Sequence, residues 1–267
     1  MSSQPTVPVV MALAGNDPSG GAGLQADIEA IVSMGCHAAP VVTTLTVQDT
    51  RDIKEILPLT PGFIAAQARA VLEDMPVAAI KIGLIGSVEG VEAIHTLLID
   101  YPDIPVVLDP VLASGGGTEL ADQEIIEALR TLLLPQTTVL TPNGQEARRL
   151  APEADTLDAC AMALLERGCR YVLITGAHEN TPQVINRLYG NERLLETTAW
   201  ERLPGSYHGS GCTLASAIAG LIAQGQEMAS AIQQAQEYTW EALRGGYRIG
   251  MGQHIPNRLF WADDHEP

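Results

Sequence analysis

The sequence has few aromatic residues, few basic residues and no long apolar run, and each shortage excludes a class of protein. Aromatic residues make up 4% of the 267 residues. The 15 lysines and arginines face 32 acidic residues, and the net charge of −17 would repel nucleic acids and anionic membrane surfaces. No stretch approaches the ~18 consecutive apolar residues that cross a bilayer. We therefore expect no nucleic-acid partner and no membrane association.

Cysteine is also scarce. The four cysteines, at positions 36, 160, 169 and 212, lie far apart without a CxxC pair. This spacing fits neither a zinc site nor a disulfide framework, and it is typical of a reducing compartment. Residues 1–8 contain no basic patch and no apolar run of signal-peptide length. We expect a soluble, cytoplasmic protein.

The composition is aliphatic, with 46% hydrophobic residues and 25 glycines. Strand-like patterns cover 7–14, 37–47, 53–57, 78–84, 105–109, 137–140 and 171–174, with a hairpin at 184–198. Helical patterns cover 24–32, 61–74, 87–98, 122–134, 143–150, 157–167, 212–224 and 228–244. This alternation predicts an α/β fold with a mostly parallel, doubly wound central sheet.

No repeat, low-complexity segment or linker divides the chain, so we expect a single domain over 1–267, with residues 1–6 as a flexible tail. Ligands of doubly wound sheets bind beyond the carboxyl ends of the strands. Polar or glycine-rich turns follow five predicted strands, at 15–17, 48–49, 109–110, 141–143 and 175–176. We expect the functional site at that edge.

A glycine-rich loop opens the helix predicted over 212–224. Gly209, Ser210, Gly211 and Cys212 stand at its start, where backbone N–H groups are unpaired and the positive end of the helix dipole attracts an anion such as a phosphate. A thiol at this position is expected to have a lowered pKa. The alternative is a tight turn with Cys212 as a packing residue.

Six motifs occur in a characteristic order: AGNDPSGGAGLQAD at 14–27, TTLTVQDT at 43–50, KIGL at 81–84, LDPV at 108–111, TPN at 141–143 with Glu146, and GSGCT at 209–213. Together they resemble the hydroxymethylpyrimidine/phosphomethylpyrimidine kinases of vitamin B1 biosynthesis, a branch of the ribokinase-like superfamily. The resemblance extends from about Val9 to beyond Leu221. It implies a ribokinase-like three-layer sandwich that uses ATP and Mg²⁺.

The implied reaction transfers the γ-phosphoryl group of ATP to 4-amino-5-hydroxymethyl-2-methylpyrimidine and then converts the monophosphate to the diphosphate. Cys212 would accept the proton of the attacking oxygen, and the N–H groups of Gly209, Ser210 and Gly211 would stabilise the transferring group. His208 is either part of this loop's site or a surface histidine. The resemblance implies four substrate-binding residues: Gly15, Asp27, Gln48 and Leu84. Gln48 is otherwise a strand-end cap, and Asp27 a charge that interacts with a helix dipole.

On the nucleotide side the resemblance implies Asp109, Thr175 and Gly176, with Asn143 and Glu146 as Mg²⁺ ligands. Asn143 and Glu146 also fit a helix capping box. Two lysines of many relatives are missing, near Ser114 and at Thr175, and the glycine run at 115–117 is a candidate flap over the nucleotide.

Two other functions stay open. A pyridoxal or pyridoxine kinase would also act on a hydroxymethyl group, whereas a non-catalytic relative would only bind the pyrimidine. Because members of this family are commonly dimers, we expect a homodimer, with the predicted helix at 228–244 as a candidate interface.

Overall fold

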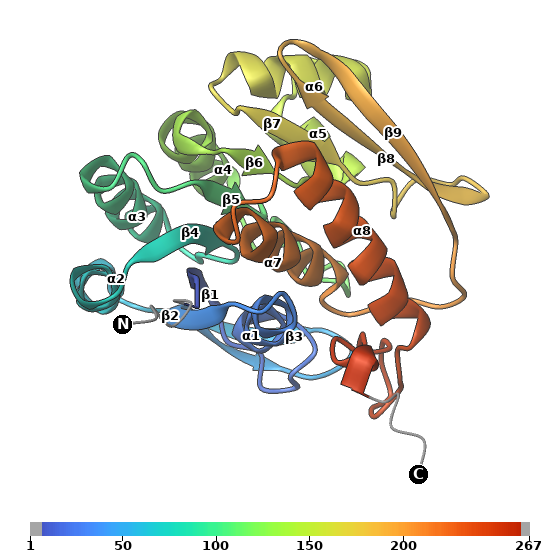
Figure 1. Cartoon of the computed structure of the whole chain (residues 1–267), viewed down its shortest axis with the longest axis horizontal. Coiled ribbons are helices and arrows are strands. Elements are labelled where there is room, and N and C mark those ends of the chain that lie inside the picture. The colour runs from blue at the N-terminus through green and yellow to red at the C-terminus, as the bar shows by residue number, and fades with distance from the viewer. Residues whose placement is uncertain (1–6, 263–267) are drawn as a thin grey trace, which may run out of the picture.

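The computed structural model describes residues 7–262, and within that range nine strands form one sheet (Figure 1). The predicted tail at 1–6 lies outside the described residues. The order across the sheet is β3-β2-β1-β4-β5-β6-β7-β8-β9. The strands are β1 (Val9–Gly15), β2 (His37–Gln48), β3 (Ile53–Pro58), β4 (Val77–Ile82), β5 (Val106–Leu108), β6 (Val139–Leu140), β7 (Tyr171–Ile174), β8 (Gln183–Gly190) and β9 (Arg193–Glu201).

The pairing confirms the predicted mostly parallel, doubly wound sheet. Strands β2, β1, β4, β5, β6 and β7 run parallel, whereas β3 at one edge and the β8–β9 hairpin at the other pair antiparallel. Every residue of β1 is buried, as its unbroken apolar run predicts for a strand covered on both faces. The chain leaves β1 toward β2 on one side and later returns to β4 on the other. In doubly wound sheets, ligands bind beyond the carboxyl ends of the strands at such a switch point.

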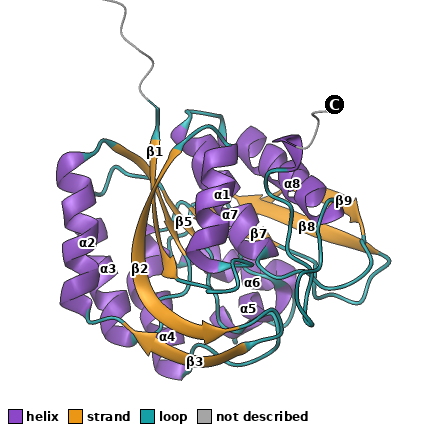
Figure 2. Ribbon diagram, turned by 90° about the horizontal axis from the view of Figure 1, so that it is seen from below, coloured by secondary structure: helices purple, strands orange, loops and turns teal. Residues whose placement is uncertain are grey.

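Helices cover both faces of the sheet and complete the predicted three-layer sandwich (Figure 2). One core lies under α2 (Pro61–Asp74), α3 (Val88–Asp100), α4 (Gln123–Ala128), α5 (Gly144–Leu150) and α6 (Leu157–Glu166). The second core lies under α1 (Gly23–Ser33), α7 (Ser210–Ala223) and α8 (Met228–Arg244).

Two helical predictions need correction or qualification. The helix predicted over 122–134 is helical but not of one type: α4 ends at Ala128, a π-helical turn follows over Leu129–Leu133, and a 3₁₀ turn over Leu134–Gln136. Pro135 supplies no N–H for a continued helical ladder. Helix α8 has the predicted bounds, but its apolar face packs on α7, and its exposed face carries Gln233, Gln234 and Glu237. The apolar face of this helix is therefore covered within the chain, and its role as an interface stays a prediction.

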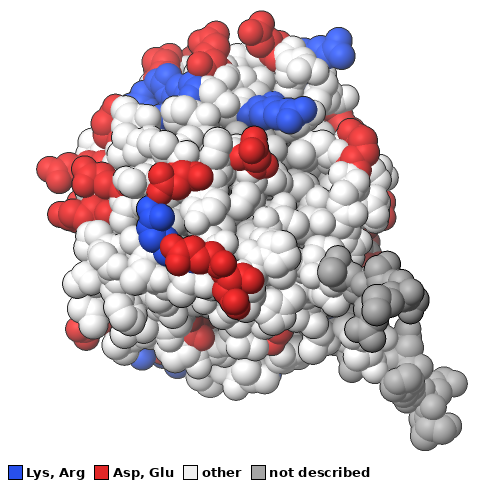
Figure 3. All heavy atoms as spheres, turned by 60° about the vertical axis from the view of Figure 1, so that its left-hand side comes forward, with Lys and Arg blue, Asp and Glu red and all other residues white. Residues whose placement is uncertain are grey.

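The surface reflects the acidic composition. On the face shown in Figure 3, acidic side chains gather in several groups with few basic ones between them. Within residues 7–262, no helix has both the length and the apolar character required to cross a membrane.

Candidate active site

Two helix N-termini meet at Cys212. Helix α7 begins at Ser210, with Gly209 as its N-cap in the left-handed region at φ +79°, and α1 begins at Gly23. The backbone N–H of Gly23 acts on the Cys212 thiol and lowers its pKa. A Cβ at Gly209 would collide with the Gly21 carbonyl oxygen, so the absence of a side chain lets the two segments approach. The positive ends of both helix dipoles therefore face the same thiol.

A buried ion pair lies behind this thiol. Lys81, near the carboxyl end of β4, places its Nζ 2.7 Å from Asp27 Oδ1, and both side chains are completely buried. Ser216 Oγ donates to the same carboxylate oxygen at 2.7 Å. A Cβ at Gly83 would stand 2.8 Å from the Lys81 Nζ, so Gly83 leaves the ammonium its space. Burial lowers the pKa of Lys81, but Asp27, Cys212 and Asp109 together outweigh burial and raise that pKa above its ordinary value.

The predicted lowering of the thiol pKa is wrong. Burial raises the pKa of Cys212 to about 12, with Lys81 acting in the opposite direction and Asp109 in the same one. Desolvation thus outweighs the attraction of nearby positive charge. At neutral pH the residue is a thiol, and it lowers the pKa of the neighbouring Asp109 carboxyl, which directly follows β5. Burial raises the pKa of Asp109 to about 6, although Lys81 opposes the shift.

A second polar group joins the loop after β1 to the end of β2. His208 Nε2 lies 2.8 Å from Gln48 Nε2 and 2.8 Å from Asp17 Oδ2. Asp17 also accepts the N–H groups of Ser19 and Ala22, each at 2.8 Å. Burial raises the pKa of Asp17, but the hydrogen bonds from His208 and Ser19 outweigh it and lower that pKa overall. His208 is buried, so its interpretation as a surface histidine is wrong.

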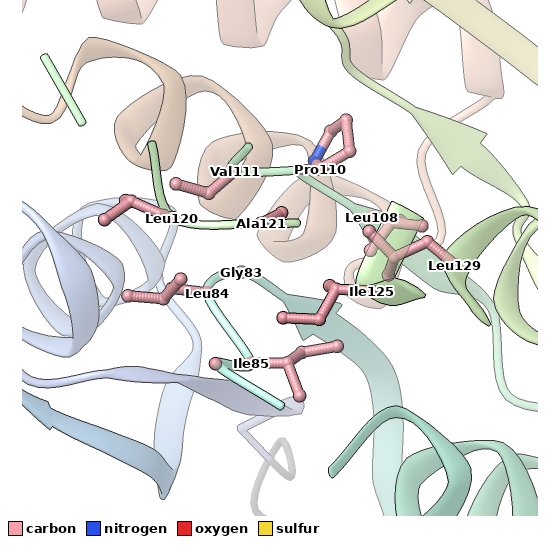
Figure 4. A pocket seen from close by; sticks show the side chains of 11 residues that line it. Gly83, Leu84, Ile85, Leu108, Pro110, Val111, Leu120, Ala121, Ile125 and Leu129 are labelled. Carbon is pink, nitrogen blue, oxygen red and sulfur yellow. The ribbon is translucent and has the colours of Figure 1, made fainter. Parts of the chain in front are cut away.

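The predicted substrate-binding residues divide into two groups. Gln48 is half-buried beside His208, whereas Asp27 is fully enclosed by Lys81 and Ser216, and Asp27 Oδ2 has no hydrogen-bond partner among the described residues. Leu84 lies against Gly15, 3.3 Å from the position of a Cβ there. Figure 4 shows Leu84 in the wall of an apolar pocket between the turn after β4 and the segment after β5. The substrate roles of all four residues stay predictions.

On the nucleotide side, Thr175 and Gly176 follow β7. The backbones of Thr175 and Asn143 pair in an isolated parallel β-bridge. The Gly176 N–H donates to Asn186 Oδ1 at 3.0 Å. Arg202 holds the next turn, because its guanidinium donates to the carbonyls of Ala177 at 2.8 Å and Thr181 at 2.8 Å. This arginine is engaged with backbone and does not replace the missing lysine of the family.

Asn143 and Glu146 form the capping box that their spacing allowed. Asn143 Oδ1 accepts the N–H groups of Gln145 and Glu146, and Glu146 Oε2 accepts the Asn143 N–H at 2.9 Å. Burial, and then the charge of Asp109, raise the pKa of Glu146 to about 8. No group of three or more His, Cys, Asp or Glu in the described part of the chain is arranged to hold a metal ion.

These carboxylates nevertheless suit Mg²⁺. Glu146 and Asp109 are buried hard-oxygen groups whose charges repel one another, and a divalent cation with its waters would relieve that repulsion. The Asn143 oxygen is already occupied by two N–H donors. Glu146 therefore fits the predicted metal role better than Asn143 does, and both roles stay predictions.

Where many relatives have a lysine near position 114, this chain has two hydrogen bonds to Asp52. Ser114 Oγ donates to Asp52 Oδ1 at 2.5 Å, and Thr118 Oγ1 donates to Asp52 Oδ2 at 2.6 Å. Both ends of the glycine run at 115–117 are therefore tied to the loop between β2 and β3. Its role as a nucleotide flap stays a prediction.

Residues 17–257 match the family model described as phosphomethylpyrimidine kinase. The hydroxymethylpyrimidine/phosphomethylpyrimidine kinase of Streptomyces coelicolor is 37% identical over 92% of this chain and 93% of its own length. That of Escherichia coli is 34% identical over 92% of this chain and 94% of its own length. The chain belongs to the phosphomethylpyrimidine kinase family. It is a kinase, and the predicted family membership is confirmed.

A bifunctional relative and two solved kinase structures are also similar to this chain. The bifunctional thiamine biosynthesis protein ThiED of Geobacter sulfurreducens is 35% identical over 96% of this chain, which spans about half (53%) of that relative. A phosphomethylpyrimidine kinase from Clostridium difficile superimposes with a TM-score of 0.77 at 30% identity, over 89% of this chain and 100% of that one. Pyridoxal kinase of Bacillus subtilis, in an ADP complex, gives a TM-score of 0.88 at 28% identity over 96% and 99%. The predicted ribokinase-like fold is confirmed.

The sequence motifs of this kinase gave no role to Lys81 or to Asp17. A lysine inside an apolar strand is a signal in itself, because a buried ammonium needs a counterion. For Asp17 the sequence carries no comparable signal, since its partner His208 lies 191 residues away.

Proposed function

We propose that this kinase transfers the γ-phosphoryl group of ATP to 4-amino-5-hydroxymethyl-2-methylpyrimidine, and then phosphorylates the monophosphate to the diphosphate in thiamin biosynthesis. The observation that carries the proposal is the meeting of the α1 and α7 N-termini at Cys212, beside the Gln48–His208–Asp17 group. The first feature suits a transferring phosphoryl group, and the second suits the polar edge of an aminopyrimidine ring.

Recognition of the pyrimidine depends on Gln48. Its amide offers both donors and an acceptor to ring nitrogen and amino group. His208 holds that amide in place, and the Asp17 carboxylate holds the imidazole. The ring would lie over the apolar surface of Leu84, where Gly15 permits a close approach.

Proton transfer would pass through Cys212. As the substrate oxygen attacks phosphorus and the bond to the ADP oxygen breaks, the hydroxyl proton moves to the Cys212 sulfur and the thiol proton moves to Asp109. Asp109 interacts with the thiol, and its raised pKa lets it hold a proton near neutral pH. Lys81 stabilises negative charge on both groups during the transfer.

The N–H groups at the start of α7, from Ser210 to Cys212, have no acceptors within the helix, so they are free to stabilise the transferring phosphoryl group. Mg²⁺, when bound, neutralises charge on the nucleotide phosphates. Glu146 and Asp109 would hold that ion through its waters.

A pyridoxal kinase is the second candidate, favoured by the close superposition on the Bacillus subtilis enzyme. The third is a pyrimidine-binding relative that lost turnover with the two lysines. We would measure ADP release with Mg·ATP and hydroxymethylpyrimidine, its monophosphate, or pyridoxal. Turnover of both pyrimidines is expected. Turnover of pyridoxal alone would establish the second candidate, and pyrimidine binding without ADP release would establish the third.

We also propose that the protein is a homodimer. Each subunit would be a single domain, and the dimer would work in the cytoplasm. The outer face of the β2–β3 pair exposes Leu45, Val47 and Leu57, an apolar surface suited to a second copy. One continuous sheet supports the single domain, and four free, widely spaced thiols fit a reducing compartment. Light scattering of the wild type and of Val47→Glu/Leu57→Glu tests the dimer, because the double variant should be monomeric.

A further inference from the structure

The C-terminal segment after α8 lies against the active site. In Figure 1 this red segment lies beside α1 and the blue loops at the start of the chain. Gln253 N donates to Thr50 O at 2.8 Å, and His208 N donates to His254 O at 2.8 Å. The segment therefore contacts both the loop after β2 and the residues that lead into α7.

Arg258 extends from this segment to the place where α1 and α7 begin. Its side chain is completely buried. Nε donates to Thr213 Oγ1 at 2.8 Å, Nη2 donates to the Gly21 carbonyl, and Nη1 pairs with Glu29 Oε2 at 3.0 Å. Thr213 lies in the first turn of α7, and Gly21 lies in the loop that leads into α1. One planar guanidinium thus joins the two segments that converge on Cys212.

We propose that Arg258 is a positioning residue for phosphoryl transfer, which holds the N-terminus of α7 in register with the 17–23 loop. Arg258 lies one residue beyond the range that matches the kinase family. The planar guanidinium of arginine fixes the direction of its hydrogen bonds as well as their length. The ammonium of a lysine, on a flexible chain, fixes direction less well. The inference rests on the proposed proton transfer at Cys212, since its effect is to hold the thiol and the helix N–H groups where the substrate oxygen reacts.

Loss of this guanidinium frees both partners. Without Arg258 the Gly21 carbonyl and the Thr213 hydroxyl lose their common donor, while Thr213 keeps its bond to the Gly209 carbonyl at 2.8 Å. The helix itself stays formed, but its start is no longer tied to the substrate loop. A displacement of about 1 Å in such a site costs on the order of 100-fold in rate.

The test compares Arg258→Met and Arg258→Lys with Tyr238→Phe. Tyr238 OH donates to the Arg258 carbonyl at 2.8 Å, so its removal loosens the same segment without touching the guanidinium. We expect Arg258→Met to lower kcat about 100-fold with acceptor Kd changed less than about 3-fold on the same reasoning. Arg258→Lys should recover part of kcat, and Tyr238→Phe should keep the wild-type kcat.

Thr213→Val provides a second route if Arg258→Met does not fold. It removes the acceptor of Nε, so it should share the kcat defect, and its combination with Arg258→Lys should not be additive. All kcat values are measured with whichever acceptor the wild type turns over, at a temperature where each variant is folded.

Alkylation of Cys212 by iodoacetamide, followed by peptide mass spectrometry, does not depend on the acceptor. Release of α7 from α1 should raise the Cys212 alkylation rate in Arg258→Met and not in Tyr238→Phe. Equal kcat losses and equal alkylation rates in the two variants would overturn the positioning role. Wild-type protein without turnover would overturn the proposed function, while the alkylation rates would still decide the role of Arg258.

Discussion

Lys81 Nζ and Asp27 Oδ1 lie 2.7 Å apart in the completely buried space between β4 and α1. This ammonium acts on both Cys212 and Asp109, which are placed by two other elements. The positive charge in the site therefore comes from a lysine near the carboxyl end of a buried strand. A buried charge of this kind is stable only while its partner remains.

Replacement of Lys81 by methionine should leave the Asp27 carboxylate buried and unpaired, and lower the free energy of unfolding by about 3–5 kcal/mol. The double variant Lys81→Met/Asp27→Asn should lose less than the sum of the single losses, because neither charge is left alone. Urea unfolding of the four proteins in this cycle measures the coupling. Additive losses would contradict the ion pair. The double variant should still have low kcat, since Cys212 and Asp109 lose the neighbouring cation.

Replacement of Cys212 by serine or alanine should lower kcat by about 10²–10⁴-fold, the usual contribution of a group that transfers a proton. The acceptor Kd should stay close to that of the wild type, because the thiol does not hold the ring. Steady-state kinetics and calorimetric titration separate the two effects. Cys160→Ala is the control, since Cys160 is buried in α6 away from the site and should keep full kcat. Wild-type turnover in both Cys212 variants would remove the thiol from the mechanism.

Stability should fall as pH rises from about 4.5 to about 8. Glu146 has its pKa raised from 4.5 to about 8, first by burial and then by Asp109. Below 4.5 the carboxyl is protonated in the folded and unfolded chain alike, so the fold carries no penalty. Above about 8 the folded protein must ionise a buried carboxyl, and the penalty is complete. Glu146→Gln should therefore reduce the decrease in Tm across this pH range.

Added Mg²⁺ tests the metal role of the same residue. At pH 8 the ion should raise the Tm of the wild type more than that of Glu146→Gln, because the glutamine keeps an oxygen for the Asn143 N–H but offers no charge to the metal. Equal increases in both proteins would exclude Glu146 as a ligand.

Gly21→Ala should disrupt acceptor recognition. A Cβ at this position would collide with the His208 ring and displace it from Gln48 and Asp17. We expect KM for the pyrimidine to rise about tenfold or more, since a buried hydrogen-bond group loses its partners. Gly62→Ala in α2 is the matched control, because a Cβ there meets no atom within 4 Å. It should leave KM unchanged and raise stability by up to ~1 kcal/mol. Equal KM values in the two variants would contradict a role for His208.

The sequence by itself determined the elements and their order. The apolar run of β1, the Pro61 start of α2 and the periodicity of α8 are local signals, and the structure has each where it was predicted. The six motifs likewise identified the family. The exception among the helices, the turn at Leu129–Leu133, is a change of helical type that apolar periodicity does not distinguish.

Only the tertiary structure decided the chemistry of the individual groups. Position at a helix N-terminus predicted a lowered thiol pKa, whereas burial beside Asp109 raises the pKa of Cys212 to about 12. Lys81 and Asp27 are 54 residues apart, and Arg258 and Gly21 are 237 apart. Local patterns determine which segments form helices and strands, because those depend on neighbours a few residues away. Desolvation and charge depend on atoms that the fold brings together from distant segments.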